Sequence, residues 1–271
     1  MTKCHLLLLT AFLILLTACK PEKGPSLSEY GSQSQATQRA RFEQYVLELL
    51  AAPTERAFQM QDSVLNAAER DSAEWRRVMD LEESFLIDPN SPLRNEELYR
   101  PVVAHLLSSP WATEKQRLRA AWIQPLLLLN RPGEPAGDFE YLTPTGRRTS
   151  LYATIDARKP KRTILFFSNP GCPNCKEITE TLSNSLRIQA MLDDDELLVV
   201  NIYPDEDVQA WLDYLPNYPK EWICGYDPDH VLRSDTLYWL RAIPSLYLLD
   251  GEKRVILKDA TLQQVLVALM D

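Results

Sequence analysis

Apolar residues recur at helical spacing through residues 38–130 of the chain. Phe42, Val46 and Leu49 fall on one face of a 3.6-residue repeat, and similar patterns follow further along. We therefore expect an all-α domain over 38–130, built from four or five packed helices. The side chains expected in its core are Trp75, Met79, Leu86, Trp122 and Leu126 to Leu129.

The pattern changes after residues 131–137, which form a short linker that contains Pro and Gly. Residues 162–168 and 197–203 are short, continuous apolar runs, as in the buried central strands of an α/β sheet. Their alternation with helical segments predicts a second domain over 131–271, in which helices cover the sheet. The other elements expected there are hairpins over 139–151 and 246–258, a strand over 222–226, and helices over 208–215 and 261–270.

The first residues, 1–18, have the pattern of a secretory signal peptide. Lys3 precedes an apolar run of about eleven residues, Leu6 to Leu16, which is too short to cross a bilayer of about 30 Å. The sequence Leu16-Thr17-Ala18-Cys19 resembles a bacterial lipobox, which implies cleavage before Cys19 and a diacylglycerol on its sulfur. The alternative is an ordinary signal peptide with a chance cysteine.

Residues 19–37 are rich in Ser, Gln, Gly and Pro, a composition that cannot bury a core, and they predict a flexible tether. The lipobox resemblance implies a periplasm-facing or cell-surface lipoprotein of a diderm bacterium, on the inner or the outer membrane. The lipid would be its only attachment to that membrane, because no later segment is long and apolar enough to span one.

Charge and composition exclude some classes of partner. The chain has 29 Lys and Arg against 38 Asp and Glu, a net charge of −9. Loss of residues 1–18 removes Lys3 alone among these, so the mature charge is 28 − 38 = −10. No basic patch stands out, and we expect no nucleic-acid partner. The helical domain has no Gly-rich loop, and its single histidine, His105, is more simply packed than catalytic; we expect no cofactor.

Three cysteines remain once Cys4 leaves with the signal peptide and Cys19 carries lipid, namely Cys172, Cys175 and Cys224. The exported compartment permits disulfides, yet three cysteines do not make a disulfide framework for a chain of this length. One close pair and one odd thiol favour a reactive site over a set of structural cross-links.

Cys172 and Cys175 lie at the expected start of a helix, after a strand that ends at Ser168. Unpaired N–H groups and the macrodipole at a helix N-terminus favour a thiolate at the first cysteine, which makes it the nucleophile. The second cysteine lies about one turn further and can break a mixed disulfide by intramolecular attack. The inward face of this helix is expected to carry Cys175, Ile178, Leu182 and Leu186.

Two other uses of the pair remain open. Cys172, Cys175, Cys224 and His230 could nominally form a Cys₃His metal site, although a redox pair suits a helix start better, and we expect no metal. A structural disulfide would close so small a loop that it would constrain the unfolded chain little. Taken alone, Cys224 is more simply a buried strand thiol, and His230 is more simply a surface turn residue.

The stretches GEPAGDFEYL, TILFFSNPGCPNCK and AIPSLYLLDGEKRVI resemble the thioredoxin superfamily, and within it the TlpA/ResA-like branch, over residues 135–271. The resemblance implies a central mixed sheet flanked by helices. It also implies that Cys172 and Cys175 are the redox pair, and that Ile243 and Pro244 form a substrate-contacting loop whose cis bond faces them. Residues 81–110 resemble a helical domain of unknown function that precedes thioredoxin-like domains in some bacterial lipoproteins.

Two residues depart from the thioredoxin pattern. Phe166 stands six positions before Cys172, where the family commonly has a buried Asp, Asn or Glu behind the second cysteine. Gly171 stands where thioredoxin has tryptophan, so a different substrate groove is expected. The acidic residues 205–207 are near in chain order, but the sequence alone does not place them.

The resemblance implies an extracytoplasmic, lipid-anchored thiol–disulfide oxidoreductase that reduces the disulfides of client proteins. Such a protein must itself be re-reduced, which implies a membrane-embedded electron donor. The alternative is a non-catalytic binding or scaffold lipoprotein that uses its thioredoxin-like part as a docking module. Alkylation of Cys172 at mildly acidic pH distinguishes the two, because only the enzyme needs a reactive thiolate there.

Overall fold

The computed structural model describes residues 34–234 and 236–270. The predicted signal peptide and Cys19 lie outside the described residues. Within the described ranges, none of the helices combines the length and apolarity that crossing a membrane requires.

The first half of the structure is helical, as the sequence predicts. Its elements are α1 (Gln35–Ala51), α2 (Thr54–Ala68), α3 (Ser72–Glu82), the π-helical turn η2 (Glu83–Ile87), α4 (Glu96–Ser108) and α5 (Glu114–Leu126). Polar side chains cap the first turns of several helices. At the start of α4, the side chain of Asn95 accepts a hydrogen bond from the N–H of Leu98 at 3.0 Å. Thr113 and Gln116 form a capping box at the start of α5.

The boundary of the predicted tether at residue 37 is wrong by three residues. Helix α1 begins at Gln35, and Ser34 is its N-cap, with Ser34 Oγ accepting the N–H of Thr37 at 3.3 Å. A serine in a polar stretch looks like part of a flexible segment, but here it satisfies a free donor of the first helical turn.

Of the side chains predicted for the helical core, Trp75, Met79, Leu86, Leu126 and Leu127 are buried and Leu129 is half-buried, but Leu128 is 53% exposed. Trp122 is another exception, because its side chain is 63% exposed. The inward positions of α5 are Ala120, Ile123 and Leu126, and Trp122 lies on another face of the helix. There it packs edge-to-face against Trp239 of the second region, with ring centroids 6.3 Å apart.

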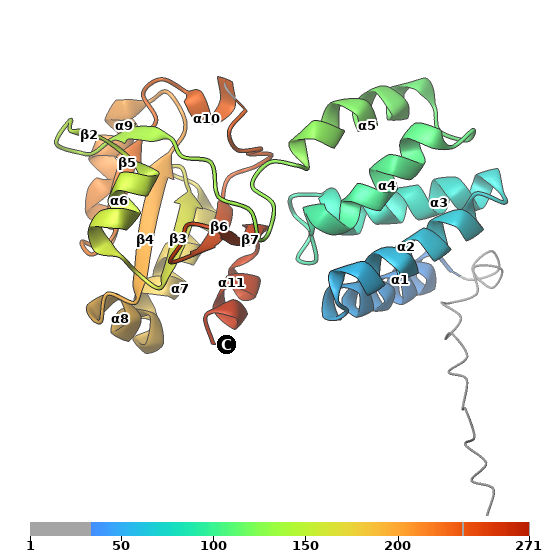
Figure 1. Ribbon diagram of the computed structural model, residues 1–271, viewed down its shortest axis with the longest axis horizontal. Helices are drawn as coiled ribbons and strands as arrows, with labels where there is room; N and C mark the ends of the chain where they lie inside the picture. Colours follow the sequence, from blue (N-terminus) through green and yellow to red (C-terminus); the bar gives the residue numbers. More distant parts are fainter. Residues whose placement is uncertain (1–33, 235, 271) are drawn as a thin grey trace, which may run out of the picture.

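The second region contains a mixed seven-stranded sheet, which confirms the predicted fold class. Its strands are β1 (Glu140–Leu142), β2 (Arg148–Ser150), β3 (Arg162–Phe167), β4 (Leu197–Tyr203), β5 (Ile223–Tyr226), β6 (Ser245–Asp250) and β7 (Val255–Ala260). They lie in the order β2-β1-β5-β4-β3-β6-β7 (Figure 1). The three central strands, β5, β4 and β3, are parallel, and the flanking strands pair antiparallel. Both predicted hairpins are present.

Helices cover both faces of this sheet. They are α6 (Leu151–Arg158), α7 (Pro173–Asn184), α8 (Leu186–Asp193), α9 (Val208–Tyr214), the 3-10 turn η3 (Leu215–Asn217), α10 (Val231–Ser234) and α11 (Leu262–Ala268). The buried residues of α7, α8 and α11 share one core cluster with one face of the sheet, and those of α6 and α10 share another. This arrangement places the predicted cysteine helix, α7, against a central part of the sheet.

Some local predictions for these helices are wrong. Leu186 was expected to continue the inward face of α7, but the helix ends at Asn184 and Leu186 is 87% exposed. Ser185 interrupts the helix, because its side chain accepts the N–H of Ile188 and starts α8. The helix predicted over 208–215 is present as α9, and Trp211 is its only buried residue.

The helical region lies beside the β6–β7 edge of the sheet (Figure 1). Residues 131–137, predicted as a linker, are hydrogen-bonded to the start of β7 and to the turn before it. The N–H of Gly133 donates to the carbonyl of Val255 at 2.8 Å, and the N–H of Ala136 donates to that of Lys253 at 2.9 Å. The connection between the two regions is therefore part of the folded structure.

Candidate functional site

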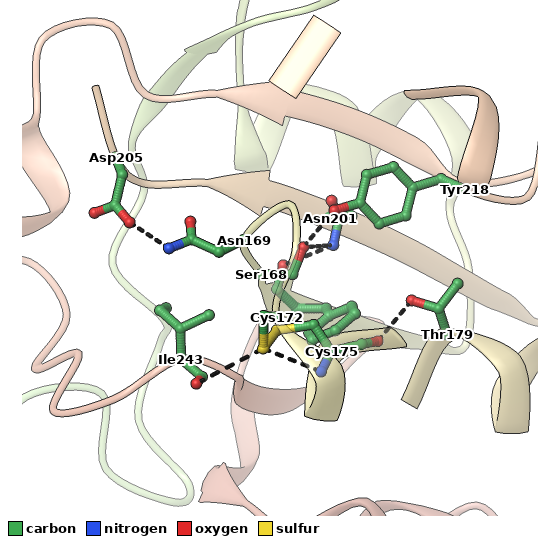
Figure 2. The surroundings of a disulfide bond; sticks show 10 residues. Ser168, Asn169, Cys172, Cys175, Thr179, Asn201, Asp205, Tyr218 and Ile243 are labelled. Atoms are coloured by element: carbon green, nitrogen blue, oxygen red, sulfur yellow. Dashed lines mark hydrogen bonds between the residues drawn. A yellow bond between two sulfur atoms is a disulfide. The ribbon is translucent and has the colours of Figure 1, made fainter. Parts of the chain in front are cut away.

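The two cysteines predicted as a redox pair form a disulfide at the start of α7 (Figure 2). Strand β3 ends at Phe167, and the chain turns through Gly171, whose φ of +74° is a left-handed conformation that suits glycine. Cys172 is the N-cap of α7 and Pro173 occupies its first turn, where no backbone donor is needed. The turn and the cap together fix the pair at the end of a central strand.

The two sulfur atoms differ in their surroundings. Cys172 is half-buried, whereas Cys175 is only 3% exposed and belongs to the core under α7. The N–H of Cys175 points to Cys172 Sγ at 3.2 Å, as in other N-cap contacts. After reduction, this N–H and the start of the helix favour a thiolate at Cys172. The arrangement allows Cys172 to meet another molecule while Cys175 stays covered.

The loop before β6 faces the pair, as expected from the sequence. The bond between Ile243 and Pro244 is cis, which confirms that prediction. The carbonyl oxygen of Ile243 lies 4.0 Å from Cys172 Sγ (Figure 2). Cys172 and Ile243 are 71 positions apart in the chain, and the fold brings them together at one edge of the disulfide.

The sheet behind Cys175 carries no carboxylate at the position where the thioredoxin pattern has one. Phe166 is fully buried in the same core cluster as Cys175, and its ring packs edge-to-face on Trp222 with centroids 6.2 Å apart. Its neighbours in register are Asn201 on β4 and, beyond it, Cys224 on β5. A phenylalanine, an amide and a thiol therefore form the row behind the pair.

A buried polar network that sequence reasoning missed lies beside this row. Asn201 Nδ2 donates to Ser168 Oγ at 2.7 Å, and Ser168 Oγ lies 2.9 Å from the hydroxyl of Tyr218 (Figure 2). Burial raises the pKa of Tyr218 to about 12, so the network is neutral near pH 7. Asn201 interrupts the apolar run LLVVNIY with an amide, and this interruption was the sign in the sequence that a buried polar contact lies there.

Asp205 contacts the loop that precedes the pair. Its carboxylate accepts a hydrogen bond from Asn169 Nδ2 at 2.5 Å and pairs with Arg233 at 2.8 Å. Asp205 therefore supports the turn between β3 and Cys172 (Figure 2). The sequence alone could not place Asp205 near the pair, because this residue follows β4 whereas the cysteines follow β3.

The remaining candidates do not join the pair. Cys224 is a half-buried free thiol on β5, and His230 lies in a turn with a positive φ of 54°. Among the residues that the structure describes, no cluster of three or more His, Cys, Asp or Glu could hold a metal ion. His105 packs between helices, with Nδ1 3.1 Å from Glu69 and Nε2 3.6 Å from Asp62.

Cys224 should react slowly with alkylating reagents at pH 8, because burial raises the pKa of its thiol to about 12. Only the thiolate reacts, so its rate should rise about tenfold per pH unit towards pH 12. Mass spectrometry of iodoacetamide labelling in a Cys172→Ser/Cys175→Ser variant measures this, with the same chain in urea as the control. Equal rates in the folded and the unfolded chain at pH 8 would contradict the burial.

The sheet order, the disulfide at the helix start and the facing cis-proline loop define a thioredoxin-like protein. The chain is similar over 91% of its length to a thioredoxin-like protein from Bacteroides caccae, with 35% sequence identity, a TM-score of 0.80 and 88% of that chain covered. The chain belongs to this family of thioredoxin-like proteins.

Other comparisons cover one region each. The C-terminal domain of an uncharacterized protein from Bacteroides fragilis is 42% identical, with 52% of this chain and 99% of that chain covered and a TM-score of 0.49. The thioredoxin domain of a thiol-disulfide oxidoreductase from Bacteroides vulgatus is 19% identical, with coverage of 52% and 99% and a TM-score of 0.43. Residues 27–130 match a domain of unknown function (DUF5106). No curated protein matches the chain.

Proposed function

We propose that this protein is a thiol–disulfide oxidoreductase that reduces disulfides in client proteins. The observation that carries the proposal is the disulfide itself, in which a half-buried Cys172 caps a helix and faces the Ile243–Pro244 loop while Cys175 is buried. A purely structural cross-link has no need of an accessible sulfur at a helix N-terminus.

The reaction proceeds in two exchanges. The Cys172 thiolate attacks one sulfur of a client disulfide, so a Cys172–client bond forms, the client S–S bond breaks and one client thiolate leaves. The Cys175 thiolate then attacks Cys172 Sγ, which releases the second client thiolate and forms the Cys172–Cys175 disulfide. Two electrons pass to the client, and the protein ends in the oxidised state seen in the structure.

The oxidised pair must be reduced again before another turnover. A reduced dithiol protein can do this by the same two exchanges in the opposite direction. We propose that the ultimate donor is embedded in the membrane and that Cys19 carries the lipid that keeps this protein near it. Both proposals rest on the signal-peptide and lipobox patterns of residues 1–19.

Reduction of insulin with dithiothreitol as the electron donor tests the proposed function. The wild-type chain should accelerate precipitation of the freed insulin chain, and Cys172→Ala should return the rate to the uncatalysed background. Cys224→Ala is the matched control and should keep the wild-type rate, because this thiol is free and takes no part in the disulfide. A wild-type rate at background would contradict the proposal and favour a binding or scaffold role.

Cys19→Ala should release the protein from the membrane or block its processing, because one lipid-bearing cysteine is the proposed attachment. Fractionation of cells into soluble and membrane material measures the effect. Cys4→Ala is the control, since this residue is expected to leave with the signal peptide. Equal partition into detergent with and without Cys19 would be inconsistent with lipid anchoring.

A further inference from the structure

Residues of both regions line one groove beside the catalytic disulfide. The thioredoxin-like region contributes α7 and the loop with the cis bond, and the helical region contributes the loop between η2 and α4. The lining residues used below are Pro89, Asn90, Arg94, Glu177, Ile243 and Pro244, around a cavity of about 260 Å³. We call this cavity the interdomain groove.

The helical side of the groove is held in place by direct contacts with the sheet region. Arg94 Nε donates to the carbonyl of Asp259 at 3.0 Å, and Arg94 Nη2 donates to that of Ala260 at 2.9 Å. Within the loop, Ser91 Oγ donates to the carbonyl of Phe85 at 2.6 Å, and the N–H of Asn90 donates to Asp88 at 2.8 Å. Pro89 and Asn90 therefore have a defined position relative to β7.

The opposite wall is held by the same interface. Arg241, two residues before Ile243, pairs through Nε with Glu96 of α4 at 3.1 Å, and both side chains are almost fully buried. Just after the cis bond, Ser245 Oγ donates to Asp259 Oδ1 at 2.8 Å. The loop that faces Cys172 is thus bonded to the helical region, and both walls of the groove belong to one connected interface.

The groove also has a charge that is not neutralised. Glu177 is exposed on α7, next to a Lys176 that pairs with Glu180 at 3.7 Å. Glu177 itself has no ion-pair partner in the described part of the chain, whereas Arg94 in the same groove contacts Asp259. A client with a basic side chain near its cysteine would supply the missing charge.

We propose that the helical region forms half of the client-binding site, and that an extended client segment next to the attacked cysteine lies in the interdomain groove. The segment would pass between Pro89–Asn90 and Ile243–Pro244, with a basic side chain beside Glu177. This inference rests on the proposed function and gives the helical region a role in choosing clients. A small disulfide can reach Cys172 without filling the groove, so the two kinds of substrate should respond differently to changes in it.

The test uses the reduced full chain and single-cysteine peptides whose sulfur is joined to 2-nitro-5-thiobenzoate. Attack on the peptide sulfur releases the coloured thiolate and leaves the peptide on Cys172. Ellman's reagent is the small substrate, and the measured quantity is the ratio of peptide to Ellman rate constants. Asn90→Trp, which fills the groove, should lower this ratio about tenfold, as expected for loss of a main contact region. Asn66→Trp, on an exposed position of α2, is the control and should keep the ratio.

A charge reversal provides an independent arm that does not depend on fitting a large side chain. The wild type should prefer a peptide with Lys beside the cysteine over one with Glu by about threefold, and Glu177→Lys should reverse that preference. Unchanged ratios in both Asn90→Trp and Glu177→Lys would overturn the inference while leaving the oxidoreductase intact. A wild type that reduces neither class of substrate would overturn the proposed function and the inference together.

Discussion

Replacing Glu96 with alanine should lower the free energy of unfolding by about 3–5 kcal/mol, because it leaves the buried Lys258 without its counter-ion and removes one of the two carboxylates that pair with Arg241. Glu96 lies in the first turn of α4 with its side chain 1% exposed. It pairs with Arg241 at 3.1 Å and with Lys258 at 2.8 Å, and both partners belong to the sheet region. Burial raises the pKa of Glu96, and the two cations oppose that effect.

The same substitution should weaken the junction between the two regions. Lys258 also donates to the carbonyl of Leu127 at 3.1 Å, at the end of α5, so its position depends on several contacts. Urea unfolding followed by circular dichroism measures the loss in stability. Glu83→Ala is the matched control, since its ion pair with Arg119 is exposed and should contribute less than about 1 kcal/mol. If Glu96→Ala and Glu83→Ala cause the same small loss of stability, the buried ion pairs of Glu96 do not couple the two regions.

The second large effect concerns the pH dependence of the two exchanges. As pH falls below 7, resolution by Cys175 should slow more than attack by Cys172, and the mixed disulfide should accumulate. The reason is burial: Cys175 is covered, Phe166 lies in the same core cluster, and an apolar environment disfavours a thiolate. Cys172, at the helix start beside the N–H of Cys175, keeps a better-stabilised thiolate.

Acid-quenched single-turnover experiments measure the fraction of trapped mixed disulfide at each pH. Phe166→Asp should speed resolution about tenfold by supplying a proton acceptor, at some cost in stability from the buried carboxylate. Ile164→Asp is the control, because Ile164 lies on the same strand and face, two residues further from the pair. Resolution that is independent of pH in the wild type would contradict this mechanism.

The parts of the fold that the sequence predicted are those encoded by local patterns. The apolar runs of β3 and β4 and the Asp250-Gly251 turn between β6 and β7 each specify an element within a few residues. The helix start at Cys172 was also predictable, because a strand, a Gly-containing loop and a proline mark it. The short helices α6 and α8 were missed, since two turns with few buried residues give no clear period.

The contacts that complete the site depend on residues far apart in the chain. Glu96 and Arg241 are 145 positions apart, and nothing in the local pattern of either segment indicates the other. The neighbouring pair Lys258 and Asp259 was a signal of another kind, because charged residues inside a strand need partners. Asn201 gave the same signal within β4. Such residues indicate that a partner exists, but only the fold identifies it.

The most direct test of the proposed redox pair is to capture the intermediate that it requires. Reduced full-length Cys175→Ser is incubated with insulin, quenched with acid and digested, and the disulfide-linked peptides are identified by mass spectrometry. The account predicts an insulin cysteine joined to Cys172, with no such product in Cys172→Ser/Cys175→Ser. Absence of the adduct, or an adduct on Cys224 in place of Cys172, would contradict it.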